Sequence, residues 1–256
     1  MPAVRAEAAA PPAQHLLVRY AKRGKMRFAS HRDVGRAVER GVRRAGLPIA
    51  HSSGFTPHPK ISYASGTPTC VASEAEYLTL ALSSPRDPGL VRSALDAALP
   101  DGIDVIDVTE HAGGTLTGRL TASEWRMALP GVPPEEAAAA ARLFLDAERV
   151  WVERSTNKGI RRLDVRAAVL TMELDRRGCA AYPSDCGTLR MVVRHTEPAV
   201  RPENVLTALR QVTGLTPAAP AIVTRLAQGM PGEDGLLGDE GVLPAGQEAP
   251  DTQELP

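Results

Sequence analysis

Positive charge gathers in one stretch near the start of the chain, although the sequence of 256 residues has a net charge of zero. Residues 16–60 contain eleven lysines and arginines against two acids, Asp33 and Glu39, a local excess of nine positive charges. Residues 229–256, by contrast, carry seven acids and no lysine or arginine. Because a phosphate backbone attracts clustered basic side chains, the first stretch is a candidate surface for binding a polyanion.

Four arginines of this stretch fall on one face of an expected helix. With residues 31–45 placed at steps of about 100°, small apolar residues gather on one side and arginines on the other. The arginines of this face are Arg32, Arg36, Arg40 and Arg43. We interpret them as a ridge that holds phosphate groups, and the alternative is the ordinary charged face of an exposed helix. A ridge that contacts several phosphates predicts binding that weakens steeply with salt.

The loop after this helix holds further candidates for binding. Residues 51–60 are rich in Pro, Gly and Ser, so they cannot form regular structure throughout. Phe55 could stack on a base, but we expect it to plug the domain, because aromatic side chains are more often buried than displayed. Tyr63 is a second candidate for stacking. His58 and Lys60 could hold a phosphate together, and the alternative for His58 is a surface position without a role.

Two further groups of charged residues leave their role open. Glu74 and Glu76 lie at the start of an expected strand, where they could do acid–base chemistry or could be solvated acids at a strand edge. The second half contains a basic patch, which we interpret as a hairpin tip that makes a second contact with a nucleic-acid backbone. Its members are Arg154, Lys158, Arg161, Arg162 and Arg166, of which Arg161 and Arg162 are the principal candidates.

The expected secondary structure repeats one order of elements. Alternating apolar residues predict the first strand, and Ser30 with Asp33 three residues later marks the start of the basic helix. The first half is expected to contain strands at 14–29, 75–82 and 103–109, an extended segment at 51–67, and helices at 31–45 and 88–99. The second half is expected to contain strands at 123–129, 163–175, 189–195 and 221–227, and helices at 134–149 and 202–213.

Both halves follow the order βαββαβ, which is the order of the ferredoxin-like fold. We therefore expect an α+β protein of two tandem ferredoxin-like domains, each with a four-stranded antiparallel sheet covered on one face by two helices. The expected divisions are a disordered tail at 1–13, a first domain at 14–110, a linker at 111–121, a second domain at 122–228 and an acidic disordered tail at 229–256.

Several classes of site are missing from the sequence. It contains no phosphate-binding glycine loop, no dinucleotide-binding fingerprint and no His-Glu-x-x-His motif. Cys70, Cys179 and Cys186 match neither a zinc ribbon nor an iron–sulfur loop, so we expect buried thiols and no metal site in this chain. No apolar run approaches the roughly 20 residues of a membrane span, and no secretory signal is recognisable. These features predict a cytoplasmic protein without a membrane partner.

Three short motifs stand close together in the first half. They are Arg-Phe-Ala-Ser-His-Arg-Asp at 27–33, Ser-Gly-Phe-Thr-Pro-His-Pro-Lys-Ile-Ser at 53–62 and Ala-Ser-Glu-Ala-Glu-Tyr at 72–77. Together they resemble the radical SAM-linked protein family, an uncharacterised domain found beside or fused to radical SAM enzymes that also bind cobalamin. The resemblance implies a non-catalytic companion of such an enzyme. It also implies that the partner enzyme, and not this chain, binds the 4Fe-4S cluster, SAM and cobalamin.

Three functions follow as hypotheses. The first is an accessory protein that binds RNA (tRNA or rRNA), or presents another substrate, through its arginine-rich face for modification by the radical SAM enzyme. In the second, the tandem domains resemble the metal-independent endoribonucleases that process CRISPR repeats, and His31 at the helix start is the general acid or base. In the third, the protein is a scaffold whose basic helix docks on an acidic surface of the partner enzyme.

Overall fold

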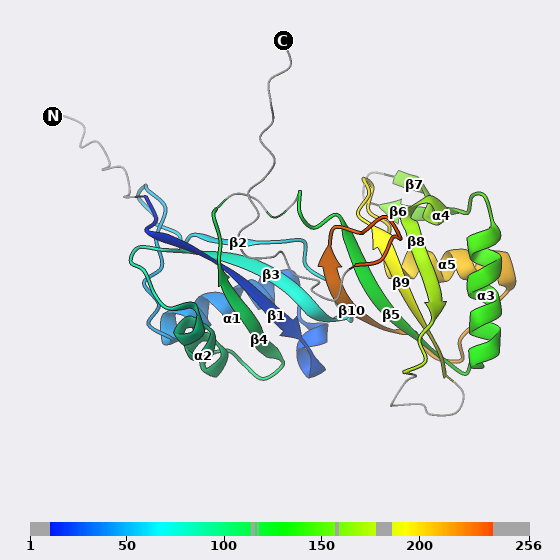
Figure 1. Cartoon of the computed structure of the whole chain (residues 1–256), viewed down its shortest axis with the longest axis horizontal. Helices are drawn as coiled ribbons and strands as arrows, with labels where there is room; N and C mark the ends of the chain where they lie inside the picture. The colour runs from blue at the N-terminus through cyan, green and yellow to red at the C-terminus, as the bar shows by residue number, and fades with distance from the viewer. Residues whose placement is uncertain (1–10, 114–115, 117, 157–158, 178–185, 238–256) are drawn as a thin grey trace, which may run out of the picture.

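The computed structural model describes residues 11–113, 116, 118–156, 159–177 and 186–237 (Figure 1). The first half consists of β1 (Gln14–Lys22), the 3-10 helix η1 (Gly24–Phe28), α1 (His31–Arg44), β2 (Ile61–Tyr63), β3 (Ala72–Leu82), α2 (Pro88–Ala98) and β4 (Ile103–Glu110). The second half consists of β5 (Ala122–Pro130), α3 (Pro134–Asp146), β6 (Trp151–Thr156), β7 (Gly159–Asp164), α4 (Val165–Ala168), β8 (Val169–Leu174), β9 (Cys186–Arg194), α5 (Pro202–Thr213) and β10 (Ile222–Gly229). The expected fold class, α+β with two tandem ferredoxin-like units, is confirmed.

Strands of both halves form one continuous sheet, while β6 and β7 form a separate hairpin. In the described residues its order is β4-β1-β3-β10-β5-β9-β8, and the short β2 pairs with β3 as well. The halves meet where β10 runs parallel to the start of β3, with Thr224 opposite Ala72 and Arg225 opposite Ser73. The other pairs of neighbours in this sheet are antiparallel. Each half therefore keeps the antiparallel ferredoxin-like arrangement, and a single parallel contact joins the two.

Each half has its own hydrophobic core under its helices. In the first half, Leu16 and Val18 of β1 pack with Leu78 and Leu80 of β3 against the apolar side of α1. In the second half, α3, α5, β5 and β9 surround a separate core. Val71, which precedes β3, is buried in the core of the second half, so the loop before β3 is held by both halves.

Local sequence explains the limits of α1. The backbone N–H of Asp33 donates to Ser30 Oγ, and the Asp33 carboxylate accepts from the backbone N–H and the hydroxyl of Ser30, which completes a capping box. The hydrogen bond from the Ser30 hydroxyl is the main reason why the pKa of Asp33 lies below its ordinary value. The helix buries Val34, Ala37, Val38, Gly41 and Val42. The chain leaves the helix at Gly46, whose φ of 64° is in the left-handed region that favours glycine.

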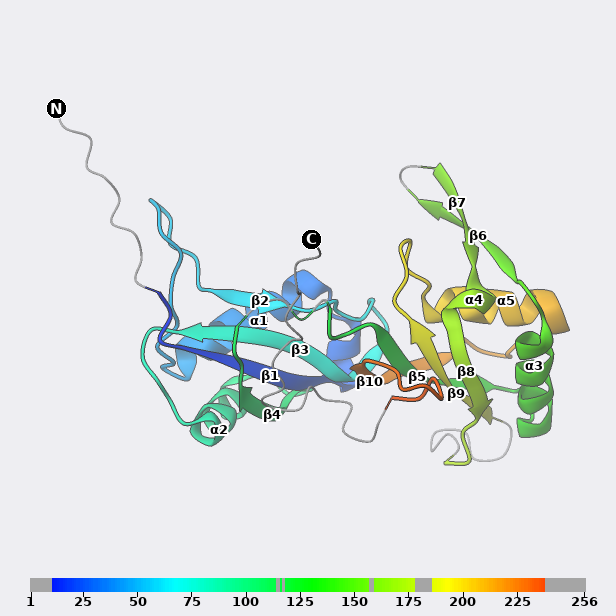
Figure 2. The ribbon, with the colours of Figure 1, turned by 45° about the horizontal axis from the view of Figure 1, so that its top comes forward.

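Two expected strands differ from the observed elements. Residues 24–28 form η1 and not the end of β1, because Gly24 takes a φ of 50° and turns the chain out of the strand. In the second half, the hairpin β6–β7 and the short α4 are inserted before β8. The strand expected at 163–175 is therefore divided between β7 and β8. Figure 2 shows the hairpin projecting from the body of the second half.

The expected linker covers part of the sheet. Leu116 and Leu120 are buried against Leu17 and Tyr77. Leu17 lies on the face of β1 opposite to Leu16, which packs towards α1. The segment therefore packs on the sheet face that carries no helix in the first half.

The described part of the expected acidic tail also packs on the sheet. Residues 229–237 complete β10 and then turn back, and Leu237 is buried beside Val192 of β9. This part of the chain is ordered, contrary to the expectation, because it has an apolar side chain to bury. Residues 1–10 and 238–256 of the expected tails lie outside the described residues. In the part of the chain that the structure describes, no helix combines the length and apolar character needed to cross a bilayer.

Candidate nucleic-acid interface

The four arginines predicted to form a ridge are exposed on one face of α1. Arg32, Arg36, Arg40 and Arg43 all reach solvent, while the opposite face of the helix is buried on the sheet. At a rise of about 1.5 Å per residue, the ridge extends over roughly 16 Å of helix. The arginines recur with helical spacing, so neighbouring guanidinium groups can meet successive groups of an extended ligand.

The ridge keeps a net positive charge, although the charge of Asp33 acts on Arg32 and Arg36. Among the described residues, no carboxylate lies within 4.0 Å of the guanidinium groups of Arg32, Arg36, Arg40 or Arg43. Glu39 shares this face but forms no ion pair with them, and its charge acts on Tyr63. Arg44 is not part of the ridge, because its guanidinium donates to the carbonyl oxygen of Ala98 on α2.

The loop between α1 and β2 displays Phe55 at its tip. His51 and Pro59 form an isolated bridge, and the backbone N–H of Ser52 donates to the carbonyl oxygen of His58 at 2.9 Å, so the loop is a narrow, closed projection. The Phe55 ring is completely exposed. The expectation that Phe55 plugs the domain is therefore wrong, because the bonds at the base of the loop hold its tip away from the core. An aromatic ring in this position is available for stacking on a base.

His58 and Lys60 lie lower in the same loop. His58 is exposed, and its backbone N–H donates to Ser52 Oγ at 3.0 Å. Lys60 is half-buried, and its backbone bonds to Ala50 and Ala81 anchor the loop to the end of β3. No ion pair of Lys60 is found among the described residues. The two side chains thus belong to the loop that carries Phe55 and not to the ridge itself.

Tyr63 and His31 meet under the first turn of α1. Tyr63 is half-buried, its hydroxyl donates to the carbonyl oxygen of Gly35 at 3.3 Å, and burial together with Glu39 raises its pKa. The exposed His31 ring stands edge-on to Tyr63, with ring centroids 5.6 Å apart. A Cβ on Gly66 would lie only 2.6 Å from His31 Cδ2. The Tyr63 side chain therefore packs against α1 and is less accessible than Phe55 for stacking on a base.

The second candidate contact lies on the hairpin β6–β7. Arg161 and Arg162 are exposed, and the Arg162 guanidinium lies over the ring of Trp151 at 4.7 Å from its centroid. Arg154 is held back by a bond to the carbonyl oxygen of Ala199. Lys158 lies outside the described residues. In Figure 2, the hairpin and the loop before β2 project in the same direction from the two halves.

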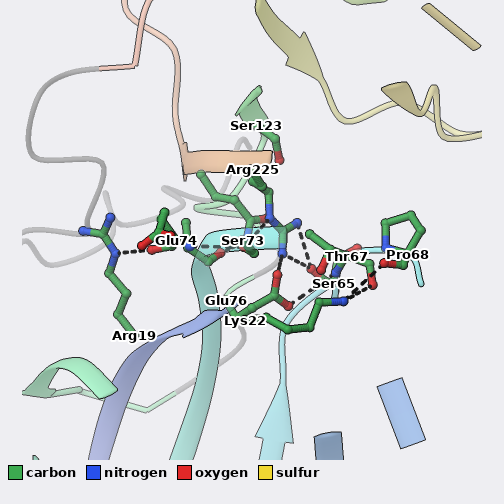
Figure 3. Close-up of polar contacts among 12 residues, drawn as sticks. Arg19, Lys22, Ser65, Thr67, Pro68, Ser73, Glu74, Glu76, Ser123 and Arg225 are labelled. Carbon is green, nitrogen blue, oxygen red and sulfur yellow. Dashed lines mark hydrogen bonds and ion pairs between the residues drawn. The ribbon is translucent and has the colours of Figure 1, made fainter. Parts of the chain in front are cut away.

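A buried charged cluster joins the halves, and sequence reasoning missed it. Arg225 Nη2 on β10 lies 2.5 Å from Glu76 Oε1 on β3, and the two side chains are only 3% and 5% exposed (Figure 3). Arg225 also donates to the carbonyl oxygen of Ser65 through two nitrogens at 3.1 Å. Burial by itself would raise the pKa of Glu76, but Arg225 and a hydrogen bond from Ser73 hold it below its ordinary value.

The alternative of solvated acids at a strand edge is wrong for Glu76. Glu76 is buried under Arg225, whose strand β10 pairs with β3 at Ala72 and Ser73. Glu74 forms an ion pair with Arg23. Sequence reasoning could not pair Glu76 with Arg225, because the two residues lie 149 positions apart.

Three basic residues of the first stretch do not contribute to an open anion-binding surface. Lys22 is buried, where it donates to the carbonyl oxygens of Thr67 and Pro68, and burial lowers its pKa. Arg23 is neutralised by Glu74 and by Asp104. Arg19 donates to the backbone carbonyl of Glu74. The predicted basic surface is therefore narrower than the charge count suggests, and α1 forms its centre.

The cysteines have different environments. Cys186 is buried, as expected, but Cys70 is exposed, contrary to expectation, because it lies in a loop between the two halves. Cys179 lies outside the described residues. Within the described residues, no three His, Cys, Asp or Glu side chains are placed to hold a metal ion.

The fold and surface define a class of protein: two ferredoxin-like units on one sheet, with a helix whose four exposed arginines form no ion pair with a described carboxylate. The chain belongs to the bacterial family described as "Uncharacterized protein conserved in bacteria (DUF2344)", whose profile matches residues 15–202. No curated protein matches the sequence. Among solved structures, the chain is similar to the first two RRM domains of the yeast poly(U)-binding protein Pub1, at 8% identity and a TM-score of 0.21 over 82% of this chain and 98% of that one.

Proposed function

We propose that this protein is a non-catalytic accessory protein that binds RNA through α1 and the loop before β2 and presents it to a radical SAM enzyme. The observation that carries the proposal is the unpaired arginine ridge. Four exposed guanidinium groups that form no ion pair with the described carboxylates are a surface that a phosphate backbone can neutralise. The partner enzyme is inferred from the motifs at 27–33, 53–62 and 72–77, which resemble the radical SAM-linked family.

Phe55 supports RNA as the polyanion. A fully exposed phenylalanine on a projecting loop loses nothing in packing if it meets a base, and stacking on single-stranded RNA contributes about 1–3 kcal/mol per base. Arg161 and Arg162 on the hairpin would provide a second contact with the backbone. Ridge, loop and hairpin together fit one extended strand better than a compact anion, because their charges are spread over both halves.

The test is a filter-binding titration of labelled tRNA at several salt concentrations. We expect the variant with Arg36, Arg40 and Arg43 changed to Glu to bind at least about tenfold more weakly. Its plot of log K against log salt should be shallower by about 2, since each lost contact with a strand removes about 0.7. A control variant with Arg92, Arg142 and Arg149 changed to Glu has the same net charge but leaves the ridge intact. Equal affinities of the two variants would refute the ridge.

Phe55→Ala separates stacking from general charge attraction. We expect roughly 5- to 150-fold weaker RNA binding, an unchanged salt slope and an unchanged melting temperature, because the ring contacts nothing in the folded chain. If affinity is unchanged, the loop does not contact the RNA.

Two further assays decide between this proposal and the other hypotheses. Co-purification of the radical SAM enzyme that survives nuclease treatment, and that is lost in the ridge variant, would show that α1 is a scaffold surface. Cleavage of labelled RNA without metal, abolished in His31→Ala, would show a nuclease. The proposal expects neither result.

A further inference from the structure

A cavity lies between the two halves on the side of the sheet that carries the helices. Its volume is about 560 Å³, within the roughly 300–1,000 Å³ of small-ligand sites. The segment 69–71 of the first half forms one wall, and α5 with the segment 217–221 forms the other. The cavity is therefore absent from either half taken alone.

The lining of the cavity combines apolar surfaces with a few polar groups. Apolar contacts come from Val71, Met127 and Val223. Pro217 and Pro220 belong to the wall that faces the segment 69–71. Thr69, Glu203 and Arg210 supply a hydroxyl, an acceptor and a set of donors. No ion pair or hydrogen bond of the Arg210 guanidinium is found among the described residues. Such a site suits a flat ligand with apolar faces and both donors and acceptors on its edge.

The wall formed by the first half is rigid. Val71 is buried in the core of the second half. The Arg225 guanidinium holds the carbonyl oxygen of Ser65, and Lys22 Nζ holds those of Thr67 and Pro68 at 3.4 and 3.2 Å (Figure 3). The buried charged cluster therefore fixes the loop before β3 in place, and a ligand would meet a preformed wall.

One wall of the cavity is bonded to the segment that leads into the ridge. The backbone N–H of Cys70, a lining residue, donates to the carbonyl oxygen of Arg27 at 2.8 Å. Arg27 belongs to η1, which leads within a few residues into α1 and Arg32. A strand that follows the arginine ridge towards the start of α1 is therefore led towards the segment that is bonded to this wall.

We propose that the cavity binds one nucleobase of the RNA, unstacked from its neighbours. This inference rests on the proposed function and assigns to it a second site, in which the base is read by its edge. The apolar walls replace the stacking of the base, Arg210 donates to ring or carbonyl acceptors, and Glu203 accepts from an exocyclic amine or ring N–H. Negative charge on the RNA backbone is matched by the ridge outside the cavity.

The first measurement uses the four ribonucleoside 5′-monophosphates as probes in saturation-transfer difference NMR with the full chain. We expect saturation transfer to the base protons of at least one nucleotide. Ala219→Trp, which places a bulky ring in the cavity, should abolish the transfer, and Arg210→Ala, an exposed substitution, should weaken it. Arg142→Ala on α3 is the matched control and should leave it unchanged. The proposal would be overturned if no nucleotide showed saturation transfer, or if Ala219→Trp and Arg210→Ala left the transfer unchanged.

The second measurement is the filter-binding titration with Ala219→Trp. We expect tRNA affinity to fall by roughly tenfold with the same salt slope, since one base contact is lost but no phosphate contact. Unchanged affinity would overturn the base site while leaving the ridge intact. If the ridge does not bind RNA, the result is different. The wild type and the variant with Arg36, Arg40 and Arg43 changed to Glu would then bind RNA with the same affinity. That result would also overturn the assignment of the base to RNA.

Discussion

Replacing Arg225 by Met tests the joint between the two halves. The substitution leaves Glu76 buried without its main partner, and removing one member of a buried ion pair costs about 3–5 kcal/mol. The lost hydrogen bonds to Ser65 are part of that figure. For a chain of this length, about 1 kcal/mol corresponds to 2–4 °C, so the melting temperature should fall by roughly 6–20 °C. Urea unfolding followed by tryptophan fluorescence measures the change in free energy directly.

The loss of stability in Arg225→Met should change with pH in a direction that identifies its cause. In the wild type the pKa of Glu76 is held below its ordinary value, so the ion pair stabilises above about pH 4.3 and this stability is lost as the pH falls through the folded pKa. Without Arg225, burial raises the pKa of Glu76. The destabilisation should then be largest at neutral pH and should shrink as the pH falls.

The double variant Arg225→Met/Glu76→Gln completes this test. Removing the stranded charge should recover part of the loss at pH 7, because an uncharged amide is less costly to bury than a carboxylate. The exposed pair Arg201–Glu203, 3.6 Å apart, is the control, and Glu203→Gln should change stability by less than about 1 kcal/mol. A loss below about 1 kcal/mol for Arg225→Met, or a double variant no more stable than the single one, would refute the reasoning.

Three other predictions concern packing, capping and protonation. Gly187→Ala should destabilise by about 1–3 kcal/mol in urea unfolding, because the new Cβ would lie 2.5 Å from that of Ala137; a neutral result would mean that α3 can shift. Ser30→Ala should cost about 1 kcal/mol through loss of the capping box with Asp33, and melting curves equal to wild type would contradict the role of the cap. Burial lowers the pKa of His195, so stability present above about pH 6.5 should fall as the pH drops towards the folded pKa; an NMR titration of the ring that shows an ordinary or raised pKa would oppose this.

Features encoded by neighbouring residues were predictable from the sequence. The limits expected for α5, 202–213, are those observed, and Ser30 with Asp33 marks the start of α1. Helical spacing also predicted the exposed face of four arginines. In each case the determining contacts lie within one or two turns, so a short window of sequence contains them.

Features that depend on distant residues were not predictable in this way. The parallel contact of β10 with β3 involves two residues on each strand, which leaves no periodic pattern. Glu76 therefore resembled a surface acid, although Arg225 covers it. Phe55 was wrongly expected in the core. The average burial of aromatic side chains does not tell how a particular loop holds one of them. The cavity between the halves depends on the same long-range contact and had no signature in the sequence.

The central place of β10 has a consequence for how the chain matures. Among the strands of the sheet it is synthesised last, yet it fills the gap between β3 and β5. Until the ribosome has released this segment, β5 presents a bare edge and β3 is open at Ala72 and Ser73, outside the residues that β2 covers. Such edges are sites of unwanted association between chains. The nascent protein must therefore avoid association through these unpaired strand edges. A translation product that stops before β10 should be retained by chaperones or degraded.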